Sequence, residues 1–449
     1  MREASLDPRA PAPGRPRPHL GPAAGKGILT VALPRRRVEL RKDLARAILA
    51  GHPWIYRDAI RDPGELPDGA VVVVTTARGR ALGRGFWSRD TPIAVRMLTL
   101  DKADDLAALV RARLAAALER RLAFIDRRRT NAFRWVHGEP DRLPGIHLDV
   151  YATAGAIRFD GDGARAFYVD QQDIARLVME VGASIELGGL VERRRGPRAR
   201  PKHGGPTGDE AGRAENQDEA LLLAGARPAG ELEVREEGLA FGVDLVHGQK
   251  GGLFLDQRDN RVRVGALARG RRVLNLFGYT GGFSVHAAAG GAAATTTVDL
   301  SPGAVAAAAR NFERNGFSAG PPPQTHEVVV ADAFTFLEDA ANRRRRWDLV
   351  ISDPPSFAPS QKALPAALGA YARLHRLCAA VVEPGGMLCA ASCSSHVDAP
   401  AFLATVEDGC RQARRHFSLI ESHGAAADHP VADFFPEGRY LKLVLGTVT

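Results

Sequence analysis

The sequence predicts an α/β fold organised around an open, mostly parallel β-sheet, and three observations carry this prediction. The first is a short apolar run at residues 273–277, which has the length and composition of a buried strand. The second is a glycine-rich turn at 278–282, which a helix-like segment follows. The third is a set of later strand-like runs that each lead into an aspartate. This combination is typical of sheets that bind a nucleoside.

The turn at 278–282 has the sequence Gly-Tyr-Thr-Gly-Gly. Glycines between a strand and a helix let backbone amides approach a ligand closely, because no Cβ atom intervenes. The turn lacks the G-x-G-x-x-G spacing of dinucleotide-binding proteins, so the sequence does not predict that class. A unit in which the glycines serve only close packing is the alternative that this segment alone leaves open.

Three aspartates, Asp299, Asp332 and Asp353, each stand at or just past the end of a predicted parallel strand. Ligands of open α/β sheets bind at these carboxyl ends. An acidic residue at the end of the second strand, here Asp299, can accept hydrogen bonds from ribose hydroxyls. The pattern therefore predicts an adenosine-bearing ligand whose reactive group lies near Asp353.

The whole chain has the composition of a soluble globular protein and a basic net charge. Hydrophobic residues make up 45% of the 449 positions and charged residues 25%. No apolar run reaches the length of a membrane span, and the first residues lack the pattern of a secretory leader, so no membrane partner is expected. The formal net charge of +9 points toward an anionic partner, and nucleic acid is the leading candidate.

Cysteine usage indicates a reducing compartment. The spacing of the cysteines matches no zinc pattern, so the sequence predicts no metal site. Without a secretory leader they are expected to be reduced thiols, and the protein is expected to be cytoplasmic. All of them lie in the C-terminal part of the chain, at Cys378, Cys389, Cys393 and Cys410.

Composition divides the first part of the chain into a tail and a small domain. Residues 1–28 are rich in Pro, Arg, Ala and Gly without periodicity, which predicts a disordered tail. Residues 29–103 contain short strand-like runs and a helix at 42–50, which predicts a small β-barrel. Trp54 and Phe86 stand among arginines there and suit base stacking on an RNA platform, while burial in the core is the alternative for each.

Two further segments lead to the sheet. Residues 104–191 are predicted to form an α+β connecting domain, which begins with a long Ala/Leu/Arg helix spanning about 101–129. Residues 192–230 are polar and rich in Gly, Pro and Arg, which predicts a flexible insertion. The last domain occupies 231–449 and opens with an alternating strand pair.

The motifs along the chain resemble a known family. The last domain contains, in this order, HGQKGGLFLDQRDNR, LNLFGYTGGFSVHAAAGGA, VDLS, DAFTFL, DPPSFA and ASCSSHV. This order is similar to that of the bacterial 23S rRNA cytosine-5 methyltransferases that carry an N-terminal PUA domain. Other segments that resemble the family are HPWIY, GRGFWSRDTPIAVRML, VHGEPDRLPGIHLD and PEGRYLK. The resemblance extends from about residue 30 to 445, apart from 192–230, and rests on the motifs as a set.

The resemblance implies an S-adenosylmethionine-dependent enzyme that acts on 23S rRNA. It implies a PUA domain, a connecting domain and a Rossmann-like class I methyltransferase domain. The sequence leaves open whether two copies form a homodimer.

The resemblance also implies which residues hold the cofactor. Asp299 resembles the ribose-binding carboxylate, and Asp332 resembles the residue beside the adenine. Two glycines, Gly251 and Gly278, stand where other residues are expected in relatives, which puts the rigidity of their loops in doubt. The remaining implied cofactor residues are the loop Phe277, Gly278, Tyr279, Thr280 and Gly281, together with Phe254, Arg258 and Asp353.

The chemistry of cytosine C5 methylation indicates two catalytic residues. C5 is a poor nucleophile, and a thiolate that adds to C6 converts the ring into an enamine that attacks the methyl group. Cys393 follows a predicted strand and opens a serine-rich turn, an exposed position that suits a nucleophile. Asp353, in a stiff Asp-Pro-Pro loop, is the candidate acid near N3 and could clamp a flipped base. His396 and His429 are candidates for proton transfer, with a structural or phosphate-binding role as the alternative.

Two other functions remain open from the sequence. One is an S-adenosylmethionine-dependent enzyme that methylates an rRNA nitrogen, for which a loop like that of Asp353 suffices and no thiol is needed. The other is a non-catalytic RNA-binding or assembly factor that keeps the fold. The set of cofactor motifs favours an enzyme.

Overall fold

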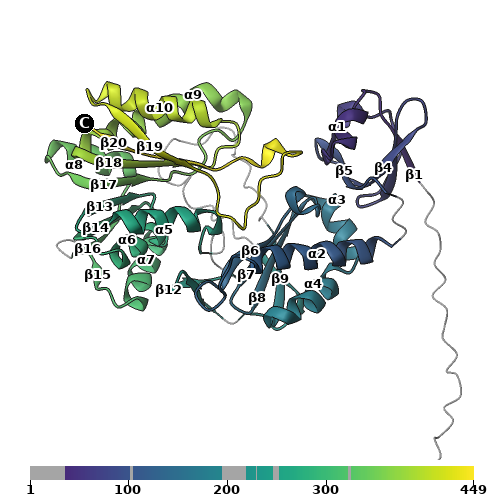
Figure 1. Ribbon diagram of the computed structural model, residues 1–449, viewed down its shortest axis with the longest axis horizontal. Helices are drawn as coiled ribbons and strands as arrows, with labels where there is room; N and C mark the ends of the chain where they lie inside the picture. The colour runs from purple at the N-terminus through teal and green to yellow at the C-terminus, as the bar shows by residue number, and fades with distance from the viewer. Residues whose placement is uncertain (1–35, 102–104, 195–218, 229, 246–251, 322–324) are drawn as a thin grey trace, which may run out of the picture. The chain divides into compact units, whose positions relative to one another are not determined.

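The computed structural model describes residues 36–101, 105–194, 219–228, 230–245, 252–321 and 325–449. All of them belong to one unit, Arg36–Thr449. The predicted tail at 1–28, the centre of the predicted insertion and Gly251 lie outside the described residues. The described residues form two five-stranded sheets, one two-stranded hairpin and one eight-stranded sheet (Figure 1).

The first five-stranded sheet lies in the segment that the sequence predicts to be β-rich. Helix α1 (Ala45–Leu49) and the turn η1 (Arg57–Ala59) connect its strands. Phe86 is fully buried and stacks on Phe167 of the connecting domain with ring centroids 4.9 Å apart, so the core interpretation is right for Phe86. In spatial order the strands are β1 (Arg36–Glu39), β3 (Val71–Thr75), β4 (Ala81–Trp87), β5 (Ile93–Thr99) and β2 (Trp54–Tyr56).

The second five-stranded sheet forms the connecting domain. Helix α2 (Leu106–Leu122) is shorter than predicted: Asp105 caps its start by accepting from the Ala108 amide at 2.9 Å, and it ends before the basic residues 127–129. The other helices and turns are η2 (Glu139–Asp141), α3 (Asp162–Arg165), η3 (Ala166–Gln171), α4 (Ile174–Gly182) and η4 (Ala183–Ile185). In spatial order the strands are β10 (Glu219–Gly225), β9 (Gly189–Arg194), β8 (Ala154–Phe159), β7 (Ile146–Tyr151) and β6 (Ala132–His137).

The prediction of a flexible insertion at 192–230 is wrong at both of its ends. Strand β9 extends to Arg194, and β10 pairs with it in antiparallel register from Glu219 opposite Arg194 to Gly225 opposite Gly189. This pairing gives backbone N–H and C=O groups of both strands hydrogen-bond partners within the protein. The polar composition of the segment predicts instead that these groups bond to water. The insertion therefore joins two neighbouring strands of one sheet.

The eight-stranded sheet follows the predicted antiparallel hairpin of β11 (Leu232–Glu236) and β12 (Leu239–Val243). Its strands from β15 to β18 run parallel, and β20 lies antiparallel between β18 and β19. In spatial order they are β15 (Ala319–Gly320), β16 (His326–Val330), β14 (Ala294–Asp299), β13 (Arg272–Leu276), β17 (Trp347–Ser352), β18 (Val382–Ser392), β20 (Lys442–Val448) and β19 (Phe417–His423).

The order of this sheet reverses between β13 and β17. The chain runs outward from β13 to β14 and β16, and then returns to β17 and β18 on the other side. At such a switch point the loops after the two central strands diverge and leave a crevice at the carboxyl ends. The predicted glycine turn follows β13 and the Asp-Pro-Pro loop follows β17, so both lie at this point.

Helices cover both faces of the eight-stranded sheet (Figure 1). The core on one face joins the strands to α5 (Arg258–Leu267), α6 (Gly282–Ala289) and α7 (Pro302–Arg314). The core on the other face joins them to α8 (Ala333–Asn342), α9 (Leu364–Val381) and α10 (Ala399–Gln412). The remaining short turns are η6 (Leu255–Gln257), η7 (Gln361–Ala363) and η8 (Pro436–Gly438).

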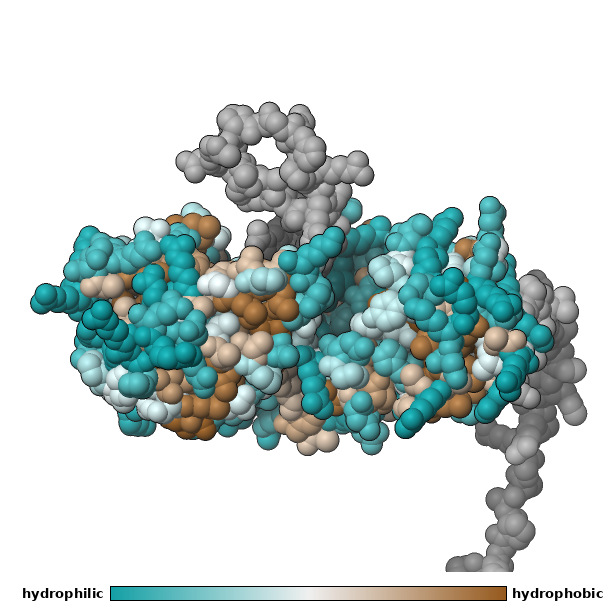
Figure 2. All heavy atoms as spheres, turned by 90° about the horizontal axis from the view of Figure 1, so that it is seen from above, coloured by the Kyte–Doolittle hydropathy of each residue, from teal (hydrophilic) through white to brown (hydrophobic). Residues whose placement is uncertain are grey.

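One face of the described residues is largely polar (Figure 2). Figure 2 shows hydrophilic side chains over much of one face, with separate hydrophobic patches between them. Scattered apolar groups of this kind are ordinary on protein surfaces. No helix among the described residues has both the length and the apolar character needed to cross a membrane.

Candidate active site

Gly278 fixes the start of the turn after β13. A Cβ atom at this position would lie 2.5 Å from Cγ2 of Thr297 on β14, so a larger residue would displace the turn. The Gly278 amide donates to the carbonyl of Val298 at 2.9 Å, and the Gly281 amide donates to the carbonyl of Gly278 at 2.8 Å. Glycine at 278 therefore does not loosen the loop, because the turn is bonded to β14 and closed on itself.

Phe277 and Tyr279, which flank this glycine, adopt φ angles of +55° and +48°. Such a backbone costs a non-glycine residue on the order of 1 kcal/mol and is concentrated at ligand-binding loops. The Tyr279 amide donates to Oδ2 of Asp299 at 2.8 Å, and the Ser301 amide donates to Oδ1 at 2.9 Å. The turn and the acidic end of β14 thus form one hydrogen-bonded unit.

Thr280 and Phe254 support the turn from its other side. Thr280 is buried, its Oγ1 donates to the carbonyl of Gly252 at 2.7 Å, and its own carbonyl accepts from Nδ2 of Asn311 at 2.9 Å. The Phe254 ring meets the Tyr279 ring edge to face with centroids 5.4 Å apart. Burial raises the pKa of Tyr279 to about 12, so its phenol stays neutral. Thr280 is therefore a support within the protein, while Phe254 and Tyr279 place aromatic surface beside the loop.

Asp332 is exposed at the carboxyl end of β16, next to β14. Its Oδ1 accepts from the Thr335 amide at 3.0 Å and from the Thr335 hydroxyl at 3.2 Å, which caps helix α8. The cap orients the carboxylate at the same edge of the sheet as Asp299, because Asp299 pairs with Val330 on β16. The two acidic strand ends predicted from the sequence therefore lie on adjacent strands.

Asp353 follows β17 and is held by a residue that the sequence analysis did not single out. Nε2 of Gln257, in the turn η6, donates to Oδ2 of Asp353 at 3.0 Å. Gln257 is 2% exposed, and its Oε1 accepts from Nδ2 of Asn260 at 2.6 Å. Gln257 stands between Phe254 and Arg258 in the motif FLDQRDNR, and only the tertiary contact reveals its role.

Cys393 directly follows β18 and is partly exposed. Strands β17 and β18 are parallel neighbours with Ser352 opposite Ala390, so Asp353 and Cys393 leave the sheet at the same edge. A hydrogen bond of 3.0 Å between the hydroxyls of Ser356 and Ser394 joins the two loops. The structure thus brings the candidate acid and the candidate nucleophile to adjacent strand ends.

The other three cysteines, Cys378, Cys389 and Cys410, are buried. Burial raises the pKa of Cys378 to about 12 and that of Cys410 to about 11, and it also raises the pKa of Cys389. A thiol that stays protonated is a poor nucleophile. Cys393 is therefore the cysteine whose position suits covalent chemistry.

Arg258 is committed to a buried ion pair. Its Nη1 and Nη2 donate to the two carboxylate oxygens of Asp428 at 2.9 and 3.1 Å, and its Nε donates to Asp259 at 3.1 Å. Asp428 also accepts from the Arg134 amide of β6 at 2.8 Å, which ties the connecting domain to the sheet domain. Burial acts to raise the pKa of Asp428, but the neighbouring His429 and Arg258 hold it well below its usual range. The structure places this arginine in a link between domains.

The two candidate proton carriers differ in their surroundings. His396 is exposed in the turn after Cys393. His429 is 3% exposed, its Nδ1 lies 3.0 Å from Oδ1 of Asp428, and its ring meets that of His137 with centroids 5.0 Å apart. His429 is thus part of the link between domains, which is the structural alternative left open by the sequence.

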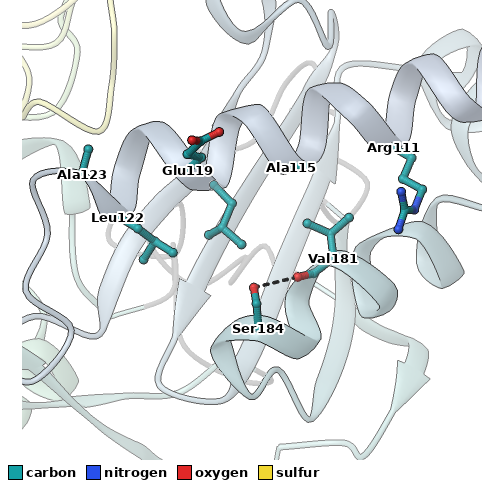
Figure 3. Close-up of a pocket in the computed structure, with 8 residues that line it drawn as sticks. Arg111, Ala115, Glu119, Leu122, Ala123, Val181 and Ser184 are labelled. Carbon is teal, nitrogen blue, oxygen red and sulfur yellow. Dashed lines mark hydrogen bonds between the residues drawn. The ribbon is translucent and has the colours of Figure 1, made fainter.

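A separate groove of about 590 Å³ lies on the connecting domain between α2 and α4 (Figure 3). Its wall combines apolar side chains with Arg111 and Glu119, and Ser184 turns its hydroxyl to the carbonyl of Val181 at 3.0 Å. The groove contains neither a glycine turn nor a thiol, so it offers none of the groups assembled at the strand ends. Among the described residues, no group of three or more His, Cys, Asp or Glu side chains could hold a metal ion.

Comparison with known families and structures agrees with this geometry. Residues 213–436 match the family of S-adenosylmethionine-dependent methyltransferases, and residues 38–100 match the PUA-like domain. A structure described as a SAM-dependent methyltransferase from Streptococcus mutans has a TM-score of 0.74 at 22% identity, covering 92% of this chain and 99% of that one. A methyltransferase solved in complex with SAH has a TM-score of 0.75 at 23% identity, with the same coverage. These likenesses confirm the predicted fold: a PUA-like domain followed by a Rossmann-like methyltransferase domain.

Two curated relatives span nearly the whole chain. The ribosomal RNA large subunit methyltransferase I of Shewanella denitrificans is 32% identical over 416 residues, which cover 92% of this chain and 99% of the relative. The protein of the same name from Photobacterium profundum is 34% identical over 411 residues, which cover 90% and 97%. The chain therefore belongs to the ribosomal RNA large subunit methyltransferase I family of S-adenosylmethionine-dependent enzymes.

Proposed function

We propose that this enzyme forms 5-methylcytosine in 23S rRNA through a covalent adduct between Cys393 and C6 of the target base. One observation carries the proposal: Asp353 and Cys393 follow the parallel neighbours β17 and β18 at the edge where the glycine turn lies. The names of the relatives, which specify ribosomal RNA of the large subunit, support the substrate class. The PUA-like domain and the net charge of +9 are consistent with an RNA partner.

The residues at the switch point fit S-adenosylmethionine. A Cβ atom at Gly278 would lie 2.5 Å from Cγ2 of Thr297 and displace the turn, and Asp299 is fixed beside the turn by the Tyr279 amide. In the proposed site the turn would face the amino-acid end of the cofactor, Asp299 would accept from the ribose hydroxyls and Asp332 would lie beside the adenine. Phe254 would offer aromatic surface. The bound cofactor supplies an electrophilic methyl group on a sulfonium.

The chain's own groups would carry the remaining chemistry. The Cys393 thiolate adds to C6 and forms a C–S bond, which makes C5 nucleophilic. Asp353, with its proton directed at N3, stabilises the negative charge that develops in the ring. C5 would then take the methyl group, whose bond to the sulfonium breaks and leaves both electrons on the cofactor sulfur as a neutral thioether. A base would remove the C5 proton, and the bond between Cys393 and C6 would break to release 5-methylcytosine and the thiolate. The thiolate is regenerated, so each turnover leaves the protein unchanged.

Methyl transfer from labelled S-adenosylmethionine to unmodified 23S rRNA tests the proposal. Wild type and Cys410→Ala, a buried control, are expected to place label in 5-methylcytosine, whereas Cys393→Ala should lose at least about a thousandfold in rate. RNA that carries 5-fluorocytosine should trap wild type as a covalent complex, because fluorine at C5 cannot leave as a proton does. Label in another base, or label that survives Cys393→Ala, would favour methylation of an rRNA nitrogen and overturn the covalent mechanism.

A further inference from the structure

Lys442 is a buried cation at the first position of β20, directly opposite Ser392 of β18. The residue is 5% exposed. Its Nζ donates to the carbonyl of Ser394 at 2.5 Å and to the carbonyl of Tyr440 at 2.8 Å. Because Ser394 directly follows Cys393, the ammonium is anchored to the turn that carries the thiol.

The charge of Lys442 is poorly compensated by the protein around it. Both hydrogen bonds of Nζ go to neutral carbonyls, and among the described residues no carboxylate forms an ion pair with it. An isolated buried ammonium is costly. Burial accordingly lowers the pKa of Lys442 to about 8, while Cys393 and Asp398 act in the opposite direction. Cys393 is thus close enough for its negative form to stabilise the ammonium.

Two phenols also lie within electrostatic range of Cys393. Tyr371 of α9 shares its hydroxyl with the hydroxyls of Ser392 at 2.8 Å and Ser394 at 2.9 Å. Tyr440 donates its hydroxyl to Oδ2 of Asp256 at 2.7 Å. Burial raises the pKa of both phenols, so they remain neutral at neutral pH. Of the three side chains Tyr371, Tyr440 and Lys442, it is Lys442 that carries a positive charge.

We propose that Lys442 is a positioning residue that holds Cys393 as a thiolate in an ion pair. The thiolate supplies the opposite charge that the lysine lacks, and the two carbonyls fix the ammonium beside it. When sulfur adds to C6 its negative charge passes into the base, and when the C–S bond breaks the charge returns to the pair. The catalytic consequence rests on the proposed function, but the ion pair is a property of the protein without substrate.

The rate at which iodoacetamide alkylates Cys393, followed by peptide mass spectrometry across pH, tests the ion pair. A free cysteine has a pKa of about 8.5, and a nearby cation lowers it. The wild-type alkylation midpoint should therefore lie below about 8.5. Lys442→Met should raise the midpoint by about one unit or more, which reduces the rate at pH 7 about tenfold. Lys442→Arg keeps the charge, so its alkylation midpoint should stay near that of wild type. Lys42→Met, at an exposed lysine, should not change the midpoint.

A wild-type midpoint at or above about 8.5, or equal midpoints in wild type and Lys442→Met, would overturn the inference. Calorimetric binding of S-adenosylmethionine checks that the variants fold, and if Lys442→Met does not, the wild-type midpoint alone decides. The two proposals fail separately. If Cys393→Ala forms no 5-methylcytosine but Lys442→Met has the same alkylation midpoint as wild type, only the ion pair is refuted. A shift in Lys442→Met with methyl transfer that survives Cys393→Ala supports the ion pair and removes the covalent mechanism.

Discussion

Nε2 of Gln257 donates a hydrogen bond to Oδ2 of Asp353 across 3.0 Å, although 96 positions separate the two residues in the chain. The orientation of the Gln257 amide is set by Asn260, whose Nδ2 donates to its Oε1 at 2.6 Å and to the carbonyl of Gly424 at 3.1 Å. With Oε1 used as an acceptor, Nε2 must face the carboxyl group. This hydrogen bond fixes Oδ2 of Asp353. Because both oxygens belong to one rigid carboxyl group, it also sets the orientation of Oδ1.

Gln257→Leu is expected to reduce the rate of methyl transfer about tenfold to a hundredfold, because a misplaced catalytic group loses rate steeply with distance. The dissociation constant for S-adenosylmethionine should change by less than about threefold, since less than 1 kcal/mol of cofactor binding is affected. Single-turnover kinetics and calorimetry measure the two quantities. Gln412→Leu, which removes a hydrogen bond to Asp408 on the exposed side of α10, is the matched control. A weaker cofactor complex with an unchanged rate would assign Gln257 to cofactor binding instead.

Gly278→Ala is expected to weaken S-adenosylmethionine binding by about tenfold or more. The added methyl group would lie 2.5 Å from Cγ2 of Thr297, so the turn must move away from β14. The hydrogen bond from the residue 278 amide to the carbonyl of Val298 would then be lost. Gly369→Ala makes the same chemical change on α9, where a Cβ atom would meet nothing within 4 Å. That control should bind normally and gain about 0.5–1 kcal/mol of stability from helix propensity. Equal affinities in both variants would show that the turn does not hold the cofactor.

The sequence predicts the central part of the sheet domain well because its patterns are local. The runs 273–277 and 347–352 are mostly apolar, as expected of strands buried on both faces, and the structure has β13 and β17 there. Strand β10 was missed because it follows a long polar stretch and exists through its pairing with β9. No local sequence pattern indicates that a strand will pair with another strand that lies beyond an insertion.

The site shows the same division between local and tertiary information. Asp299, Asp332, Asp353 and Cys393 could be proposed from the sequence because each lies at or just past the end of a strand. Gln257 and Lys442 were missed because their roles depend on contacts with residues far along the chain, or on the turn beyond a neighbouring strand. Arg258 stands in the expected motif, but the structure pairs it with Asp428, 170 positions later.

Glu236 carries a buried charge that ties the β11–β12 hairpin to helices α5 and α6. Its carboxylate accepts from Nε and Nη2 of Arg261 at 2.6 and 2.5 Å, and its Oε1 lies 3.0 Å from Nε2 of His286. Burial alone would raise the pKa of this carboxyl, but Arg261 and His286 lower it to about 2. The ionised form of Glu236 is therefore a large contributor to the stability of this region.

Glu236→Gln is expected to lower the free energy of unfolding by about 3 kcal/mol at pH 7, since the pKa falls from 4.5 to about 2 and each unit is worth about 1.4 kcal/mol. Because folding depresses this pKa, the contribution is fully present above the unfolded value of 4.5 and is lost as the pH falls toward 2. Urea unfolding of wild type and Glu236→Gln at pH 7, 4 and 3 measures how the two free energies of unfolding converge as the pH falls. Glu233→Gln, at an exposed position of the same strand, should show no such effect. A difference that does not vary with pH would indicate packing as the cause.

Asp299→Ala is expected to weaken S-adenosylmethionine binding more than Asp299→Asn does. The carboxylate accepts the Tyr279 and Ser301 amides through different oxygens, and in the proposed complex it also accepts from the ribose. Alanine removes every acceptor, and hydrogen bonds to a charged group are worth about 1.5–3 kcal/mol each, so the affinity should fall at least tenfold. Asparagine keeps one oxygen, which can serve either the loop or the ribose, and should lie between alanine and wild type. Asp105→Ala removes a carboxylate that likewise accepts a backbone amide, at the start of α2, and should cost stability without changing the affinity. If Asp299→Asn binds as tightly as wild type, the charge of this residue has no part in holding the cofactor, and its role is to fix the turn.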